Sequence, residues 1–347
     1  MSSRYGHKER LIATALSKFP LLKKAGKAAY QRLQYLLHKK NYQFQTQYSL
    51  QEVNYQNKET FFGYYDHSPL NEAGNYLIFQ AAGISTRLKP DPETPVEVVL
   101  YDWKKGKVKK VFSSSAYNWQ QGTKLQWLDR DRFIFNDYDQ AGDRYVSRIV
   151  DTKKGQVTQT IAAAVYDCHK DFALGLNFDR LMLLRPDYGY FNRKSSISLS
   201  KLDDRKDGIF YIDLEKDNQE LLISLQELKN FKSRPGFDKS LHKVNHIMIS
   251  PGGSRCIFLH RWLHKGMKTD RLILFDLQLK DLILLAEGMV SHFAWMNNDQ
   301  LFGYMAPKGK RQHITPLSCH SKILYWLRHP CWMAWATAIP MCLGGMP

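Results

Sequence analysis

Basic and aromatic residues occur close together in two parts of the chain, a combination typical of carbohydrate recognition. The candidate ligand-binding residues are Arg185, Tyr188, Tyr190, Lys243, Arg261 and Trp262. Arginine forks bind carboxylates through two hydrogen bonds, and aromatic rings stack on sugar faces. These residues therefore suit an anionic or a neutral glycan. Aromatic residues also pack between neighbouring β-sheets, so the sequence leaves a structural role equally open.

Histidines recur at similar places relative to apolar segments. His67 directly precedes Ser68-Pro69, and His246 lies four residues before Ser250-Pro251. His260 ends one apolar segment and His292 opens another. Such histidines can act as bases or metal ligands, or can simply be hydrogen-bonded within the fold. The sequence contains no GxSxG, P-loop, GxGxxG or HExxH motif, which argues against nucleotide-dependent and common hydrolytic mechanisms.

A repeated pattern predicts the elements that position these residues. Four apolar segments end in an aspartate and continue through a polar turn into another apolar segment. The aspartates are Asp102, Asp151, Asp213 and Asp276, spaced by 49, 62 and 63 residues. Aspartate commonly initiates tight turns. Each repeat is therefore predicted to contain a β-hairpin.

A second pair of strands is predicted before each aspartate, as in LQWLDRDRFIFND (125–137), FALGLNFDRLMLLR (172–185) and VNHIMISPGGSRCIFLHRW (244–262). HFAWMNNDQLFGYM (292–305) begins a further unit. Four-stranded units of this length in tandem are typical of β-propellers. We predict an all-β fold, a β-propeller of four-stranded antiparallel blades, four complete and a fifth partial. A short helix is expected near 221–231, and a β-sandwich is the alternative architecture.

Three segments carry a resemblance to known propellers: FFGYYDHSPLN (61–71), LRPDYGY (184–190) and NHIMISPGGSRCIFLHRW (245–262). The chain resembles bacterial TolB-like and WD40-like propellers. It is most similar to oligogalacturonate lyase-like propellers and to uncharacterised propellers associated with surface-polysaccharide genes. In the lyases, channel-end histidines and a glutamine hold a divalent metal. The resemblance implies that His246 and His260 are metal ligands here, with Mn or Zn as the metal.

The resulting functional hypothesis is a non-catalytic propeller that binds a glycan or a protein partner in bacterial surface-polysaccharide biosynthesis. This interpretation requires no cofactor. The alternative is a metal-dependent polysaccharide lyase or a related carbohydrate-active enzyme. A third class is a scaffold that presents one face of the propeller to other proteins.

The net charge of +17 is unevenly distributed. Residues 1–40 contribute ten basic residues against one acid, whereas residues 41–307 contribute 35 against 32. A nearly neutral body argues against nucleic-acid binding. The basic segment has apolar residues at helical spacing, which suits contact with an anionic membrane surface or with a protein partner. A loosely packed extension is the alternative. The expected location is cytoplasmic, either free or peripheral to the inner membrane. The five cysteines lack paired spacing, which fits a reducing compartment.

These observations predict three regions: a basic amphipathic helical extension at 1–41, the propeller at 42–307 and an atypical tail at 308–347. The tail has five basic residues, no acid and no strand that ends in aspartate. We interpret it as a frameshifted or truncated reading of further blades. An apolar tail that packs on a membrane or on the propeller is the alternative.

Overall fold

The computed structural model describes residues 26, 29, 30, 32, 33, 36, 37, 47, 48, 50–264, 267–307 and 313–318. The chain divides into two compact units, Met1–Glu52 and Val53–Pro347. In the first unit, the described residues between 26 and 37 are helical. Leu33, Leu36 and Leu37 in this helix are exposed to solvent. Most of the predicted extension at 1–41 and of the tail at 308–347 lies outside the described residues.

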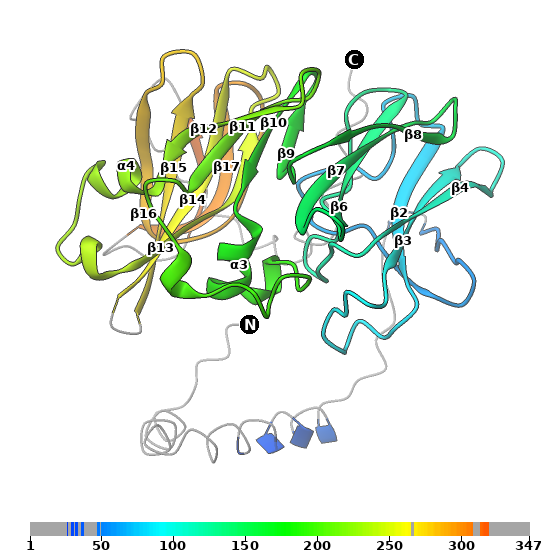
Figure 1. The fold of residues 1–347 in the computed structure, drawn as a ribbon, viewed down its shortest axis with the longest axis horizontal. Coiled ribbons are helices and arrows are strands. Elements are labelled where there is room, and N and C mark those ends of the chain that lie inside the picture. The colour runs from blue at the N-terminus through cyan, green and yellow to red at the C-terminus, as the bar shows by residue number, and fades with distance from the viewer. Residues whose placement is uncertain are drawn as a thin grey trace. The chain divides into compact units, whose positions relative to one another are not determined.

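The second unit is a β-propeller whose antiparallel sheets follow one another in chain order (Figure 1). The first blade contains β1 (Glu59–Phe61), β2 (Tyr76–Ala82), β3 (Val96–Asp102) and β4 (Lys107–Ser114). The second blade contains β5 (Gln126–Trp127), β6 (Arg132–Asp139), β7 (Arg144–Asp151) and β8 (Gln156–Ile161). The third contains β9 (Asp167–His169), β10 (Phe172–Leu176), β11 (Gly208–Asp213) and β12 (Asn218–Ser224).

The fourth blade and the partial fifth blade share one long strand. Their six-stranded sheet contains β13 (Leu241–Ile249), β14 (Arg255–His264), β15 (Met267–Asp276), β16 (Leu282–Trp295), β17 (Gln300–Pro307) and β18 (His313–Ser318). The first half of β16 pairs with β15, and its second half pairs with β17. The fold thus has four complete blades and a partial fifth, as predicted. Strand β18 adds to the fifth blade residues that the sequence pattern had placed in the tail.

The four predicted aspartates end the third strand of each complete blade. One carboxylate oxygen of each aspartate accepts from the backbone of the following turn at 2.8 to 3.0 Å, from one N–H group at Asp102 and from two each at Asp151, Asp213 and Asp276. The repeated residue therefore has one repeated physical role, which is to close the hairpin between the third and fourth strands.

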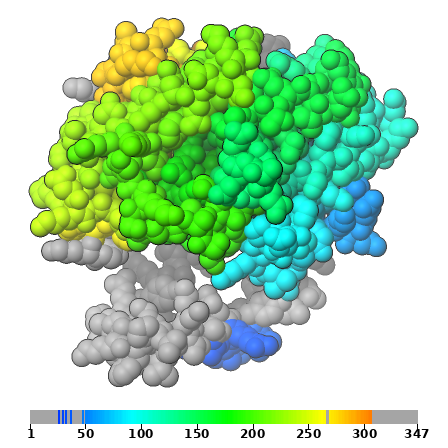
Figure 2. Space-filling model, in the orientation of Figure 1, coloured from blue at the N-terminus to red at the C-terminus, as the bar shows by residue number. Residues whose placement is uncertain are grey.

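The core lies in layers between neighbouring blades. Between the first two blades, Ile78 and Leu100 pack with Phe133 and Phe135. Similar layers join the second blade to the third, the third to the fourth, and the fourth to the fifth. Each sheet buries both faces, which explains the apolar strands in the middle of each blade. Figure 2 shows the blades as a continuous surface around a hollow near the middle of one face.

One predicted strand is instead a helix. The segment 172–185 was expected to form two paired strands, but its second part forms α3 (Phe178–Leu184). Asn177 caps this helix by accepting a hydrogen bond from the backbone N–H of Arg180. Phe178 and Leu181 then face the core at helical spacing. The short helix predicted near 221–231 is confirmed as α4 (Leu225–Asn230), which begins with a capping box between Ser224 and Glu227.

Candidate functional site

Residues 62–69 leave the inner edge of the first blade and lie against the inner strands of other blades. They follow the β1–β2 pairing, which ends at Phe61, and precede the bridge between Leu70 and Leu77. Gly63 makes this path possible because its φ is +131° and a Cβ would lie 2.9 Å from the Gln121 carbonyl oxygen. The segment therefore places Tyr64, Tyr65, Asp66 and His67 among side chains of later blades.

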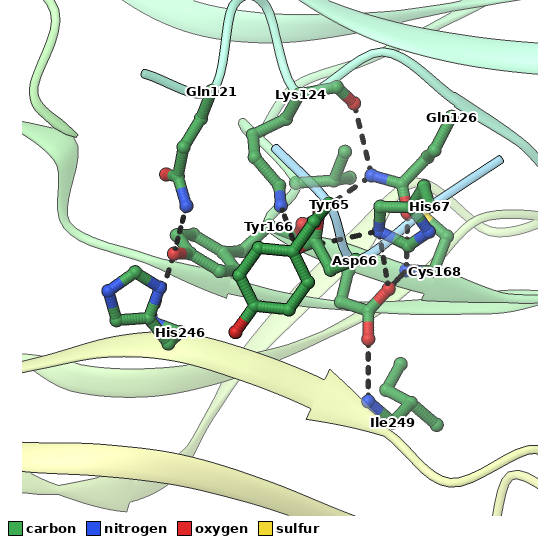
Figure 3. Close-up of polar contacts among 12 residues, drawn as sticks. Tyr65, Asp66, His67, Gln121, Lys124, Gln126, Tyr166, Cys168, His246 and Ile249 are labelled. Atoms are coloured by element: carbon green, nitrogen blue, oxygen red, sulfur yellow. Dashed lines mark hydrogen bonds and ion pairs between the residues drawn. The ribbon is translucent and has the colours of Figure 1, made fainter. Parts of the chain in front are cut away.

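A buried network of charges surrounds this segment (Figure 3). Asp66 pairs with Lys124 at 3.1 Å, and His67 lies 3.2 Å from Asp167. The Lys124 ammonium lies 4.2 Å from the centre of the Tyr166 ring. Burial raises the pKa of Asp66, but the charges of Lys124 and His67 outweigh it and hold this pKa below its ordinary value. The network joins the first three blades and balances its own charges.

The hydroxyl of Tyr166 connects this network to the fourth blade. It accepts hydrogen bonds from the Gln121 side chain at 2.7 Å and from the backbone N–H of His246 at 2.9 Å. His246 has a φ of 53° and lies in a bulge of β13. Non-glycine residues in this conformation are uncommon, and bulges often re-aim side chains beside functional sites. The bulge turns the His246 ring toward Tyr64, on which it stacks, and toward the edge of Tyr188.

A cluster of cations adjoins His246. Lys243 and Arg261 are directly opposite each other on β13 and β14. The ammonium of Lys243 donates to the Leu184 carbonyl oxygen at 3.0 Å, next to Arg185. The Arg185 guanidinium lies over the Tyr188 ring at 5.1 Å. We call Arg185, Lys243 and Arg261, with Tyr188 beside them, the cationic cluster.

The cationic cluster carries more positive than negative charge. Its buried acid is Asp270, which contacts Arg261 at 3.0 Å and Lys268 at 3.7 Å. Arg185 contacts only the exposed carboxylate of Asp187, at 3.3 Å, among the acids of the described chain. Burial, followed by the charges of Arg261 and Arg185, lowers the pKa of Lys243 to about 7. Burial and Arg261 also lower the pKa of His246. An anionic ligand would relieve this excess of positive charge.

Several hydrogen-bonding atoms in and beside the cluster have no partner among the described residues. They are Nε of Arg185, Nε of Arg261, Nδ1 of His246 and both amide atoms of Asn245. The contacts of the two guanidinium nitrogens with Asp187 and Asp270 are close enough for attraction but lie outside hydrogen-bond geometry. Buried polar atoms are normally satisfied, so their concentration here is an argument for a binding site.

The structure brings four of the six predicted ligand-binding residues together: Arg185, Tyr188, Lys243 and Arg261. The other two lie elsewhere. Tyr190 is fully buried, stacks on Phe178 at 4.2 Å and accepts a hydrogen bond from Asn136. Trp262 packs against Phe237 at 4.8 Å on the opposite face of β14 from Arg261.

The two predicted metal ligands do not meet around a common point. His246 contacts Tyr64 and Tyr188, whereas His260 lies beneath Trp262. Both ring nitrogens of His260 are occupied: Nδ1 accepts from Arg271 at 2.9 Å, and Nε2 lies 2.8 Å from Nδ1 of His242. Within the described ranges, no group of three or more His, Cys, Asp or Glu side chains is arranged to hold a metal. The residues present therefore do not fit the implied metal site.

Sequence reasoning did not identify Tyr64, Asn245 or Asp270. Asp270 could have been found, because counting back from the Asp276 turn places it opposite Arg261 in the hairpin. Asn245 precedes a bulge that no sequence signal announces. Tyr64 reaches the site only because residues 62–69 leave their blade.

Comparisons with known proteins show similarity of fold. No protein-family model matches the chain, and no curated protein matches it. Among solved structures, the propeller domain of the Trilobed protease from Pyrococcus furiosus is 12% identical, with a TM-score of 0.41, and covers 75% of this chain. This chain spans 65% of that structure's length.

Two further similar structures belong to the groups that the sequence motifs resemble. Oligogalacturonate lyase from Vibrio parahaemolyticus is 10% identical, with a TM-score of 0.42, over 79% of this chain and 80% of its own. TolB from Acinetobacter baumannii is 12% identical, with a TM-score of 0.39, over 77% of this chain and 53% of its own. No helix of the described residues is long and apolar enough to span a membrane. The chain is a β-propeller similar in fold to TolB-like and oligogalacturonate lyase-like propellers.

Proposed function

We propose that this propeller binds an acidic carbohydrate at the cationic cluster, without catalysis, in bacterial surface-polysaccharide biosynthesis. The observation that carries the proposal is the set of cations Arg185, Lys243 and Arg261 around a single buried acid, Asp270. The resemblance of residues 61–71, 184–190 and 245–262 to propellers associated with surface-polysaccharide genes supports the biological setting.

Geometry favours a carboxylate over a neutral sugar. The two guanidinium groups have nitrogens without hydrogen-bond partners among the described residues. Arginine presents paired donors that match a carboxylate. Tyr188 is buried beside these cations, and its ring positions Arg185 through a cation–π contact. A neutral sugar would leave the excess positive charge in place.

Calorimetric titration with trigalacturonate, and with maltotriose as the neutral comparison, tests the proposal. We expect binding of trigalacturonate and none of maltotriose. Arg185→Gln should weaken binding about tenfold or more, because hydrogen bonds to charged groups contribute roughly 1.5–3 kcal/mol. Arg185 is partly exposed and its ion pair is exposed, so this variant keeps the fold. Arg261→Gln should have a similar effect.

Arg255→Gln is the matched control. Arg255 lies on the same strand as Arg261 but pairs with Asp276 and Asp299 at the far end of the blade. Its loss should leave affinity unchanged. Equal affinity of the wild-type and Arg185→Gln proteins would refute the proposed site. Unsaturated sugar products from the uronate would refute the absence of catalysis and would favour the lyase.

We also propose that the N-terminal helix brings the cytoplasmic protein to an anionic membrane surface. The exposed Leu33, Leu36 and Leu37 support this proposal, together with the ten basic residues of 1–40. Co-sedimentation with phosphatidylglycerol-containing vesicles tests it. Deleting residues 1–40 should abolish binding, and neutral vesicles should bind neither form. Undiminished sedimentation of the shortened chain would contradict the proposal.

A further inference from the structure

Three lysines of the described chain are buried, and one of them differs from the other two in its partners. Lys124 pairs with Asp66 at 3.1 Å, and Lys229 pairs with Asp204 at 3.3 Å. Lys243 is as buried as Lys229 but donates to a backbone carbonyl, and no carboxylate of the described residues lies within ion-pair distance of it. Its neighbours within the cationic cluster are two arginines.

An ammonium group in this position is costly. Burial removes its hydration, and like charges repel it. The charged groups that face it are Arg261 from β14, Arg185 from the end of α3, and Lys268 and Asp270 from β15. Three of these four are cations. The resulting pKa of about 7 leaves roughly half of the Lys243 side chains as the free amine at pH 7. An ordinary lysine, with a pKa near 10.4, is unprotonated in fewer than about one molecule in a thousand.

We propose that Lys243 is a nucleophilic amine that captures the carbonyl carbon of an anionic sugar acid as an imine. The inference rests on the proposed function, because the same arginines must hold the carboxylate. The nitrogen lone pair attacks the carbonyl carbon and forms a C–N bond. The nitrogen then gives up its two hydrogens to the former carbonyl oxygen, which leaves as water, so that a C=N double bond replaces the C=O double bond. Hydrolysis reverses the step, so no oxidant or reductant is consumed. Desolvation beside other cations is a known way to activate lysine.

The position of the amine indicates the class of ligand. Lys243 lies opposite Arg261 on the neighbouring strand, and its amine reaches the Leu184 carbonyl oxygen, next to Arg185. A carboxylate held by these guanidinium groups would place a neighbouring carbonyl carbon near the amine. A 2-oxo acid, or the open-chain carbonyl of a uronic acid, has this arrangement. A glycoside without a free carbonyl can bind at the cluster but cannot react.

Reductive trapping of the full-length protein tests the inference. Glyoxylate and cyanoborohydride are added at pH 7, and the modified lysines are mapped by peptide mass spectrometry. We expect Lys243 to be modified at least about tenfold faster than Lys124 and Lys229, because carboxylates engage those two side chains, whereas Lys243 lies among cations. Acetaldehyde, which lacks the carboxylate, should show a weaker preference for Lys243. Arg185→Gln should reduce trapping of glyoxylate, and Arg255→Gln should not.

The outcomes separate this inference from the proposed function. Modification distributed over surface lysines according to their exposure, with none at Lys243, would overturn the inference. If methyl galacturonide, which has no free carbonyl, still binds in the calorimeter, the carbohydrate site stands and only the covalent step fails. Lys243→Met serves as a second variant. It removes the amine at similar volume and should abolish trapping at this position while circular dichroism remains unchanged.

Discussion

At the scale of single residues, burial has opposite consequences for the same residue type. Lys124 pairs with the carboxylate of Asp66 and lies over the Tyr166 ring. Lys243 has arginines where Lys124 has a carboxylate. A buried ion with a partner contributes to a fixed arrangement, whereas a buried ion among like charges is available for chemistry. The identity of the neighbours, more than depth in the fold, therefore distinguishes the network from the candidate site.

Two buried histidines, His242 and His260, allow a prediction about the pH dependence of stability. His260 accepts from Arg271, so its Nε2 carries the proton and donates to His242, whose Nε2 donates to the Phe237 carbonyl. A second proton on either ring would break this chain. Burial lowers the pKa of His242 to about 4 and places that of His260 below its ordinary value. The unfolded chain binds protons near pH 6.5, whereas the folded protein does not.

The contribution of these two histidines to stability should therefore be constant above about pH 6.5 and should fall as the pH decreases toward 4, by up to about 1.4 kcal/mol per pH unit for each histidine. Urea unfolding at pH 7, 6 and 5 measures this dependence. His242→Asn keeps an acceptor for His260 without a titrating ring, so its stability should change less over this range. Identical pH dependence in the two proteins would contradict the assignment.

Residue type alone predicted part of the candidate site. The prediction did not consider which face of its strand each side chain occupies. Arg261 and Trp262 were assigned to one ligand, yet neighbouring residues of a strand point to opposite faces. Period-two alternation alone would have separated Trp262 and His260 from Arg261. Tyr190 could not have been excluded in this way, since it lies in a loop whose path depends on α3. Arg185 and Tyr188 come to the cluster by the same path.

At the scale of elements, the sequence predicted most of the fold because the repeats carry local turn chemistry. The aspartate turns and the strands around them need only neighbouring residues. The helix α3 was missed because residues 178–184 form a short run rich in apolar residues, interrupted only by Asp179 and Arg180, and such runs are compatible with either a strand or a helix. The deciding feature was the cap at Asn177, which precedes the run by one residue.

The aspartate turns allow a prediction about the stability of a single hairpin. Asp151 accepts from the backbone N–H groups of Lys153 and Lys154 at 2.8 and 2.9 Å. Asp151→Ala should lower the free energy of unfolding by about 0.5–2 kcal/mol, the usual loss when a capping side chain is removed. Asp151→Asn keeps an oxygen acceptor and should lose less. Urea denaturation measures both variants. An equal loss in the two would show that charge, rather than the turn hydrogen bonds, stabilises this hairpin.

At the scale of the whole molecule, the first blade must contact the last described strands to complete the ring. Tyr65 makes this contact from the segment that leaves the first blade. Its hydroxyl donates to the carbonyl oxygen of Phe293 and accepts from the N–H of the same residue, both at 3.1 Å. One side chain thus satisfies a donor and an acceptor of β16, and its ring packs in the layer between the fourth and fifth blades. Sequence patterns could not predict this pairing, since it joins positions 228 residues apart.

Removal of this hydroxyl tests how the ring is held. Tyr65→Phe keeps the packed ring but leaves the N–H and carbonyl of Phe293 without their partner, which should cost about 1–3 kcal/mol. Tyr211→Phe is the matched control, because the Tyr211 ring stacks on Phe172 while its hydroxyl has no hydrogen-bond partner in the described part of the chain. Urea denaturation should show a clear loss for Tyr65→Phe alone. Hydrogen exchange should show faster exchange at the Phe293 amide, because a contact that closes the ring protects β16 from local opening. Equal stability of the two variants, with unchanged exchange at Phe293, would mean that apolar packing between the blades closes the ring without this hydroxyl.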